Sequence, residues 1–173
     1  MDINEFLQKS EGKWFSQRTY YDLTQQTSQD SKSEITIELL PATDAAVARL
    51  CHQAGFSPED SCGGARIGWD NSVDWDAPAQ RGQTVVAAVP SPQQPQTGQL
   101  VQQPSGDGQA PLVACYEIAA DESLTLTAEA GETYSQERLW FAHPNLRLRT
   151  VLQGSQSVSR TAFYSEIRRV SAQ

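Results

Sequence analysis

The stretch "PNLRLRT", residues 144–150, alternates two arginines with two leucines. In a β-strand, successive side chains point to opposite faces, so Arg147 and Arg149 share one face and Leu146 and Leu148 share the other. If the leucines fill the core, the arginines face water, which is the ordinary arrangement because an uncompensated buried guanidinium is costly. The reverse arrangement requires an anion inside the protein. The pattern alone favours the first arrangement, with the arginines outside.

The charge distribution restricts which partners are plausible. The chain has 173 residues and a net charge of −8, yet from residue 137 onward six arginines stand against two glutamates. An acidic chain is not expected to bind nucleic acid, which usually requires a basic surface. A local anion site in the last third remains open. Every cation after Lys32 is an arginine, and arginine suits bidentate recognition of carboxylates.

The N-terminal stretch "MDINEFLQKSEGKW" is polar and acidic, unlike a signal peptide. No apolar run has the length of a membrane span, so we expect a cytoplasmic protein without membrane insertion. A chain of this length suits one domain with a real core, and we expect a single domain over residues 1–173.

The sequence contains three cysteines and two histidines. The odd number and wide spacing of the cysteines argue against a disulfide framework and against a zinc site. Cys51 and Cys115 lie in apolar surroundings and are interpreted as structural. His52 and His143 are far apart in the sequence, so we expect no bound metal.

The local patterns predict many strands and few helices. A helix over 41–55 is predicted from a cap at Thr43 or Asp44 and a stop at Gly55. A short helix is expected at 3–8, where it caps or plugs the fold. Period-two alternation and β-branched residues predict strands at 12–23, 33–40, 65–76, 83–89, 111–119, 123–130, 132–142, 145–153 and 157–170.

The segment 90–111 is rich in glutamine and proline. This composition is typical of a disordered linker between domains. Neither flank makes a convincing domain alone, so we interpret the segment as a long loop or an extended hairpin around "GQLVQQ". Tight turns elsewhere indicate an all-β, closed antiparallel up-and-down barrel of about eight to ten strands. Such a barrel has room for one small ligand; a sandwich is the alternative fold.

Besides Arg147 and Arg149, two further groups of side chains share faces in the expected strands. Arg18 and Tyr20 share a face with Trp14, and Trp69 shares one with Trp75, opposite an acidic face of Asp70, Asp74 and Asp76. A barrel interior that combines arginine with tryptophan suits a flat, conjugated ligand that bears carboxylates. Tryptophan offers a stacking surface, and guanidinium groups grip carboxylates through two parallel hydrogen bonds.

The stretches "GKWFSQRTYYDL" at 12–23 and "ERLWFAHPNLRLRT" at 137–150 resemble the two signatures of the S-type phycobiliprotein lyases, the CpcS/CpeS family. The "GW" and "DW" pattern within 68–75 also fits this family. The resemblance implies a lipocalin-like barrel from cyanobacteria or related algae. It also implies a bound substrate, an open-chain tetrapyrrole such as phycocyanobilin, and no prosthetic group. The bilin is delivered to a cysteine of a phycobiliprotein subunit.

The resemblance further implies pocket roles for the matching residues. Arg147 and Arg149 then face inward toward the bilin propionates, and Leu146 and Leu148 face outward and pack under the 43–54 helix. The other residues with implied or inferred roles are Arg18 as a third cation, Trp69 stacked on a pyrrole ring, Trp75 at the mouth, and Glu137 or Tyr20 as a proton relay.

The expected protein partners are phycobiliprotein apo-subunits of the phycocyanin, allophycocyanin or phycoerythrin type. Whether the protein forms a homodimer stays open. Two other functions require the same features: a lipocalin-like bilin carrier that does not catalyse attachment, and a phycobilisome assembly chaperone. The sequence does not separate them from a lyase.

Overall fold

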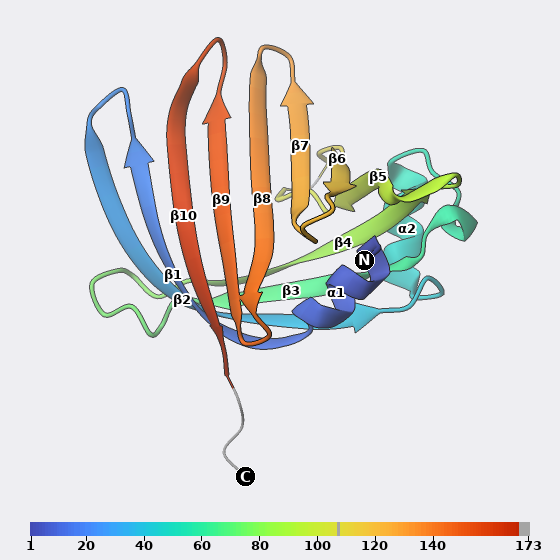
Figure 1. The fold of residues 1–173 in the computed structure, drawn as a ribbon, viewed down its shortest axis with the longest axis horizontal. Coiled ribbons are helices and arrows are strands. Elements are labelled where there is room, and N and C mark those ends of the chain that lie inside the picture. Colours follow the sequence, from blue (N-terminus) through green and yellow to red (C-terminus); the bar gives the residue numbers. More distant parts are fainter. Residues whose placement is uncertain (107, 170–173) are drawn as a thin grey trace.

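The computed structural model describes residues 1–106 and 108–169, and in this part of the chain ten strands close into one antiparallel barrel (Figure 1). Each strand pairs with its neighbour in the sequence, and β1 closes the ring against β10. The predicted closed up-and-down barrel with a main helix and a short N-terminal helix is therefore confirmed. Closure pairs the edge strands, which an open sheet would leave exposed.

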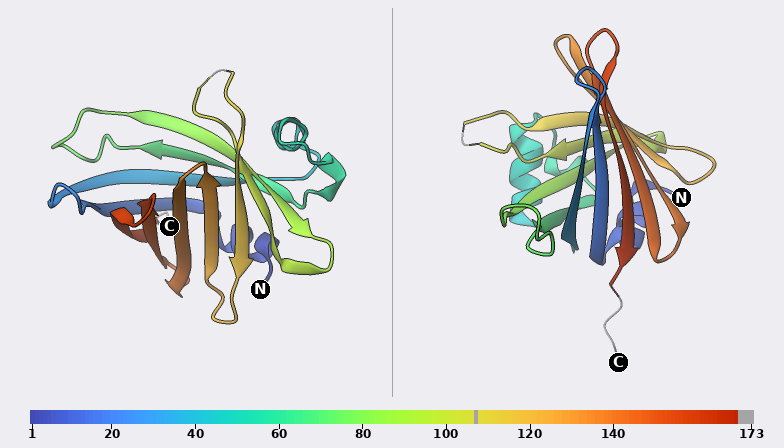
Figure 2. Two further views of the ribbon diagram at one scale, coloured as in Figure 1. Left: turned by 90° about the horizontal axis from the view of Figure 1, so that it is seen from above. Right: turned by 90° about the vertical axis from the view of Figure 1, so that its left-hand side faces the viewer.

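Short turns join most neighbouring strands, whereas α2 and η1 lie in the long connection between β2 and β3 (Figure 2). Within the described residues, no helix is both long enough and apolar enough to cross a membrane. The helices are α1 (Ile3–Ser10), α2 (Ala45–Gln53) and the 3-10 turn η1 (Pro58–Asp60). The strands are β1 (Gly12–Asp22), β2 (Thr27–Leu40), β3 (Gly63–Asp70), β4 (Arg81–Ser91), β5 (Gln94–Gln102), β6 (Leu112–Ile118), β7 (Leu124–Ala130), β8 (Thr133–His143), β9 (Leu146–Gly154) and β10 (Val158–Arg168).

Helix α2 lies outside the barrel, against β4 and β5 (Figure 1). Asp44 caps its start by accepting a hydrogen bond from the Ala46 backbone N–H at 2.8 Å, as one of the two predicted caps. Its buried face packs on outward-facing side chains of the strands. These side chains form one apolar cluster with the helix, which comprises Leu40, Val47, Leu50, Cys51, Val85, Ala87, Val89 and Val101.

Helix α1 closes one end of the barrel from within and thus acts as the expected plug. Ile3 and Phe6 are buried against the inner faces of β4, β6, β7 and β8. Phe6 also contacts Phe141, with ring centroids 5.3 Å apart. The chain then turns into β1, where the indole N–H of Trp14 donates to the Ser10 carbonyl at 2.9 Å. This end of the barrel is therefore a solid core.

Arg168, near the end of β10, locks this plug to the barrel. Its guanidinium lies 4.2 Å from the Trp14 ring centroid and donates hydrogen bonds to the carbonyls of Lys9 and Glu11. Burial, and secondarily the positive charge of Arg147, lower the pKa of Arg168. The adjacent strands β1 and β10 are thereby tied to the helix that fills this end of the barrel.

Two predicted strand boundaries are wrong, and one open alternative is decided. β2 begins at Thr27 rather than 33, because its polar first half pairs with β1 in an exposed hairpin arm and so shows no apolar period. β3 ends at Asp70, so the predicted strand 65–76 is too long. The segment 90–111 contains β5, which fits the extended hairpin and not a single loop. Residue 107 of that segment, and residue 170 of the predicted last strand, lie outside the described residues.

Replacing Phe6 by alanine tests the plug. Phe6 is 2% exposed, and truncating a buried phenylalanine costs about 3–5 kcal/mol, so Phe6→Ala should lower the urea midpoint strongly. Trp75→Ala is the matched control, because that side chain is 94% exposed and its loss should change stability by less than about 0.5 kcal/mol. Equal midpoints for the two variants would contradict the assigned core.

Candidate functional site

The barrel interior beyond helix α1 contains a cavity of about 500 Å³. This volume lies within the range of about 300–1,000 Å³ that small-molecule pockets usually have. Its walls combine apolar side chains, such as Ile35, Ile67 and Leu126, with a group of charged ones. Arg18, Glu137, Arg147, Arg149 and Glu166 all line it. The interior is therefore hollow and carries charge on one wall.

The charged wall is built from four adjacent strands whose inner side chains form cross-strand rows. The pairing of β1 with β10, β10 with β9 and β9 with β8 aligns Ser16, Glu166, Arg147 and Phe141 in one row. The next row toward the mouth comprises Arg18, Tyr164, Arg149 and Leu139. Side chains two apart on a strand share a face, so Arg147 and Arg149 both point inward.

Arg147 is held by an ion pair deep in this wall. It is only 5% exposed, and its Nε lies 2.5 Å from Oε2 of Glu166, which is 2% exposed. The guanidinium also lies 5.1 Å from the Trp14 ring centroid. Burying two charges is costly unless they are paired with good geometry. Glu166 is therefore the anion that permits Arg147 to face inward.

Arg149 pairs with Glu137 from the neighbouring strand β8. Its Nη2 donates to Glu137 Oε2 at 2.9 Å, and its Nε lies 2.7 Å from Oε1. That Nε is buried, and its N–H finds no well-aligned acceptor within the described residues. Burial by itself lowers the pKa of Arg149, but the neighbouring acidic groups, Glu137 foremost, raise it by more. The guanidinium stays charged and retains donor capacity.

Tyr164 connects the arginines of the middle row. The Arg149 guanidinium lies 4.4 Å from the Tyr164 ring centroid, and that of Arg18 lies 5.9 Å from it. Arg18 donates from Nε to the Ser31 hydroxyl at 3.0 Å. Among the described residues, no carboxylate lies within ion-pair distance of Arg18. Of the three arginines that line the cavity, Arg18 is thus the one for which the described residues provide no acidic partner.

Trp69 lies across the cavity from this wall. In the ring of ten strands, β4 stands opposite β9, and β3, which carries Trp69, is the neighbour of β4. The Trp69 ring covers Gly82 of β4 so closely that a Cβ at that position would lie 2.3 Å from it. The ring is 40% exposed and lines the cavity. One wall therefore presents guanidinium groups and the facing wall presents an indole.

The cavity opens into a second hollow of about 660 Å³ at the mouth of the barrel. Leu100, Gln102, Leu126 and Glu137 line both spaces, so Glu137 lies between the interior and the mouth. Tyr20 shares a cross-strand row with Glu137, two intervening strands away. Tyr20 is not among the described residues that line either hollow. The structure does not bring these two predicted proton donors together.

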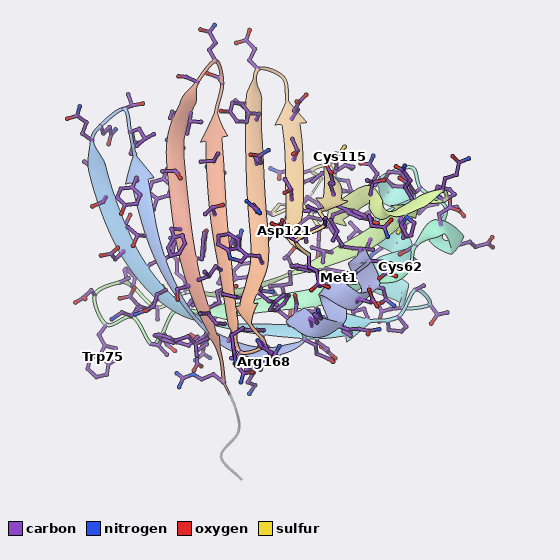
Figure 3. The ribbon with its side chains drawn as sticks, in the orientation of Figure 1. Met1, Cys62, Trp75, Cys115, Asp121 and Arg168 are labelled. Carbon is purple, nitrogen blue, oxygen red and sulfur yellow. The ribbon has the colours of Figure 1, made fainter. Side chains whose placement is uncertain are left out.

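Trp75 does not lie where the sequence places it. It belongs to the loop between β3 and β4, is 94% exposed and points away from the barrel (Figure 3). Asp74, expected on a solvated face, is 8% exposed, and its Oδ2 accepts the Lys32 backbone N–H at 2.9 Å. The side chain of Asp74 thus pins this loop to β2, which ends the period-two strand pattern and removes Trp75 from the face of Trp69.

Leu146 and Leu148 face outward, as the inward arginines require, but they do not pack under α2. The contacts of α2 are with β4, β5 and η1, on another side of the barrel. Both leucines are half-buried on the outer surface of β9. The predicted direction of these side chains is confirmed, and their predicted packing partner is wrong.

Sequence reasoning missed Tyr164 and Glu166, which organise two of the three arginines. Both lie on β10 on the same face as Arg168, and the alternation of "TAFYSEIR" carries that information. The signal was available once β10 is paired with β9, because Tyr164 and Glu166 are the direct partners of Arg149 and Arg147.

The described part of the chain shows no group of three or more His, Cys, Asp or Glu side chains placed to hold a metal ion. Cys51 is buried, Cys62 is half-buried and Cys115 is exposed on the outer face of β6 (Figure 3). Burial raises the pKa of the Cys51 and Cys62 thiols, which disfavours the reactive thiolate form.

Replacing Glu166 by glutamine should lower the free energy of unfolding, although the two side chains have nearly the same size and shape. The substitution leaves the Arg147 charge buried and unpaired, which typically costs about 3–5 kcal/mol. Glu137→Gln should cost less, because its side chain is 20% exposed and Arg149 is 30% exposed. Urea unfolding at neutral pH measures both. Unchanged stability of Glu166→Gln would show that this ion pair does not hold Arg147 in place.

The chain matches known proteins over nearly its full length. A family model described as "CpeS-like protein" matches residues 2–169. The chain is 40% identical over 169 residues to "Chromophore lyase CpcS/CpeS" of Thermosynechococcus vestitus (strain NIES-2133 / IAM M-273 / BP-1), which covers 97% of this chain and 93% of the relative. It is 31% identical over 151 residues to "Phycocyanobilin lyase subunit CpcS" of a Picosynechococcus strain, covering 86% and 76%.

A solved structure has the same fold. The S-type phycobiliprotein lyase CpeS from Guillardia theta superposes with a TM-score of 0.84 at 25% identity, covering 99% of this chain and 95% of the other. The likeness extends from the plug helix to the last strand. Sequence and structure comparisons thus agree with the family resemblance inferred from residues 12–23 and 137–150. The chain belongs to the CpeS-like protein family, the family of the CpcS/CpeS chromophore lyases.

Proposed function

We propose that this chain is a phycobiliprotein chromophore lyase that binds an open-chain tetrapyrrole of the phycocyanobilin type. It catalyses thioether attachment of the bilin to a cysteine of a phycobiliprotein apo-subunit. The observation that carries the proposal is the inward cluster of Arg18, Arg147 and Arg149, in a cavity of suitable size and in a chain of this family. The work of such a lyase belongs in the cytoplasm, where we place the protein.

The cavity suits the chemistry of a bilin. A bilin is a flat conjugated molecule with two propionate side chains, and guanidinium groups bind carboxylates with charge-assisted hydrogen bonds. The propionates therefore point to the wall of β1, β10 and β9. The ring system then extends toward the facing wall, where Trp69 offers an aromatic surface for a pyrrole ring.

The charges that line the pocket specify which contacts a bilin makes. Glu166 already neutralises Arg147, and Glu137 neutralises Arg149, whereas Arg18 contacts only a hydroxyl. One propionate binds Arg18. The second competes with Glu137 for Arg149, because that pair is the more exposed of the two. Glu137 is then free to accept hydrogen bonds from pyrrole N–H groups.

The reaction adds a thiol S–H across a carbon–carbon double bond of the bilin. The acceptor sulfur bonds to the exocyclic carbon of the ethylidene group, and the electron pair of that double bond takes up a proton at the adjacent ring carbon. Glu137 is the proton relay that the geometry favours, because it lines both the cavity and the mouth through which an acceptor approaches. Positioning of the bilin supplies much of the remaining rate enhancement.

Removing a cation tests the binding mode. Arg18→Ala and Arg149→Ala should each lose a charge-assisted contact worth about 1.5–3 kcal/mol, which weakens bilin affinity roughly 10- to 150-fold. Absorbance titration measures the affinity, and far-UV circular dichroism should stay β-rich. Arg66→Ala is the matched control, because Arg66 faces outward and pairs with exposed Glu38. Full affinity in both inward variants would contradict the pocket.

A transfer assay separates a lyase from a carrier or a chaperone. The protein is mixed with phycocyanobilin and, separately, with phycocyanin, allophycocyanin and phycoerythrin apo-subunits. A lyase gives a covalent adduct, with the absorbance of the native subunit, faster than the reaction without protein. A carrier changes the bilin spectrum without accelerating attachment, and a chaperone binds the subunit without changing the bilin spectrum. Either of the last two results overturns the proposal.

A further inference from the structure

The outer surface of the arginine wall carries a group of apolar side chains. We define the outer face as the outward-pointing side chains of β1, β10, β9 and β8. Across these strands Phe15, Ile167 and Leu146 form one row, and Leu148 lies beside Trp140 in another. Phe163 completes the apolar group on β10. At this point in the four strands, the charged side chains of the arginine wall point into the barrel and the apolar ones point outward. Antiparallel sheets usually show the reverse, with the apolar face on the core and the polar face in water.

No described element covers the outer face. Helix α2 packs on β4 and β5, and α1 lies inside the barrel (Figures 1 and 2). Ile167 is 52% exposed and Phe163 is 44% exposed. Exposed apolar side chains that are contiguous on a sheet, and not scattered singly, mark a surface on which another molecule packs.

The charges on the outer face have one sign. Its charged side chains are Lys13, Arg138 and Arg169, and in the described residues no aspartate or glutamate points outward from these four strands. Yet the whole chain has 21 acidic against 13 basic residues. The acids that meet Arg138 and Arg169, Asp121 and Glu34, belong to elements at the margins of the face.

We propose that the outer face is the docking surface for the protein substrate, an apo-subunit that presents an apolar area rimmed by carboxylates. This inference rests on the proposed lyase function, which requires a second protein to supply the cysteine. A second copy of this chain is a poorer occupant, because two outer faces bring Lys13, Arg138 and Arg169 together, and the acids Asp121 and Glu34 at the margins already pair with Arg138 and Arg169. Like charges in apposition disfavour an association.

The outer face and the pocket share strands. On β9, Leu146 and Leu148 point to the outer face, while Arg147 and Arg149 point into the cavity. The mouth lies at the other end of these strands and is rimmed by the turns that end β9 and β1, whereas Ile167 and Leu146 lie near the plugged end. A subunit docked on the outer face therefore leaves the mouth open, and a segment of the subunit that extends along the wall to this rim would bring its cysteine to the bilin.

Glutamate substitutions on the outer face test this assignment. Ile167→Glu and Phe163→Glu place a like charge against the acidic partner and desolvate it, so affinity for the apo-subunit should fall about tenfold or more. Val113→Glu is the matched control: it is 36% exposed and points outward on β6, across the ring from β1. Apo-subunit binding is measured by calorimetry, bilin binding by absorbance, and oligomeric state by light scattering.

The expected result is weaker subunit binding and a raised KM for the subunit in both face variants, with bilin affinity unchanged. Subunit binding in wild type should also weaken as salt rises, and Lys13→Glu should reduce that dependence. Unchanged subunit binding in both face variants overturns the assignment. The assignment also fails if the wild-type protein is a dimer, and Ile167→Glu and Phe163→Glu make it monomeric but leave subunit binding intact. A wild-type protein that binds the subunit but never accelerates attachment instead contradicts the lyase function alone.

Discussion

The structure depends on pairing two inward-facing guanidinium groups, one buried and one half-buried, with carboxylates from adjacent strands. Arg147 faces its direct cross-strand partner Glu166, and Arg149 reaches diagonally to Glu137. A slip of one residue in β9 would turn both arginines outward and bury two leucines in their place. The strand register that closes the barrel therefore also places both arginines in the site. The two ion pairs stabilise the inward orientation of the Arg147 and Arg149 side chains.

Because this wall is polar inside, the apolar core is placed elsewhere. Helix α1 supplies Ile3 and Phe6 to fill one end of the barrel, and α2 forms a second core outside β4 and β5. These two clusters stabilise the chain without occupying the centre. The cavity stays hollow, and Trp69 of β3 lines it together with the arginines. The separation lets one end of the barrel be solid and the other open to a ligand.

The fold was largely predictable from the sequence, because period-two alternation and short turns leave few other arrangements for so many strands. The direction of Arg147 and Arg149 was not predictable from alternation alone, since either face of β9 could be inside. It depends on Glu166 and Glu137, which lie 19 and 12 residues away in the chain and become neighbours only through pairing. The position of Trp75 was predicted wrongly for the opposite reason. The period-two alternation of the sequence continues past Asp70, but β3 ends there, and the hydrogen bond from the Lys32 backbone N–H to Asp74 holds the following residues in a loop.

Esterifying the propionates of the bilin tests the central claim most directly. The affinity of the diacid and of its dimethyl ester is measured for the unmodified protein and for Arg18→Ala/Arg149→Ala. Charge-assisted contacts to two carboxylates predict that esterification weakens binding by at least about tenfold in the unmodified protein and by little in the double variant. Equal affinity of the diacid and the ester for the unmodified protein would show that the inward arginines do not grip the acid groups of the ligand.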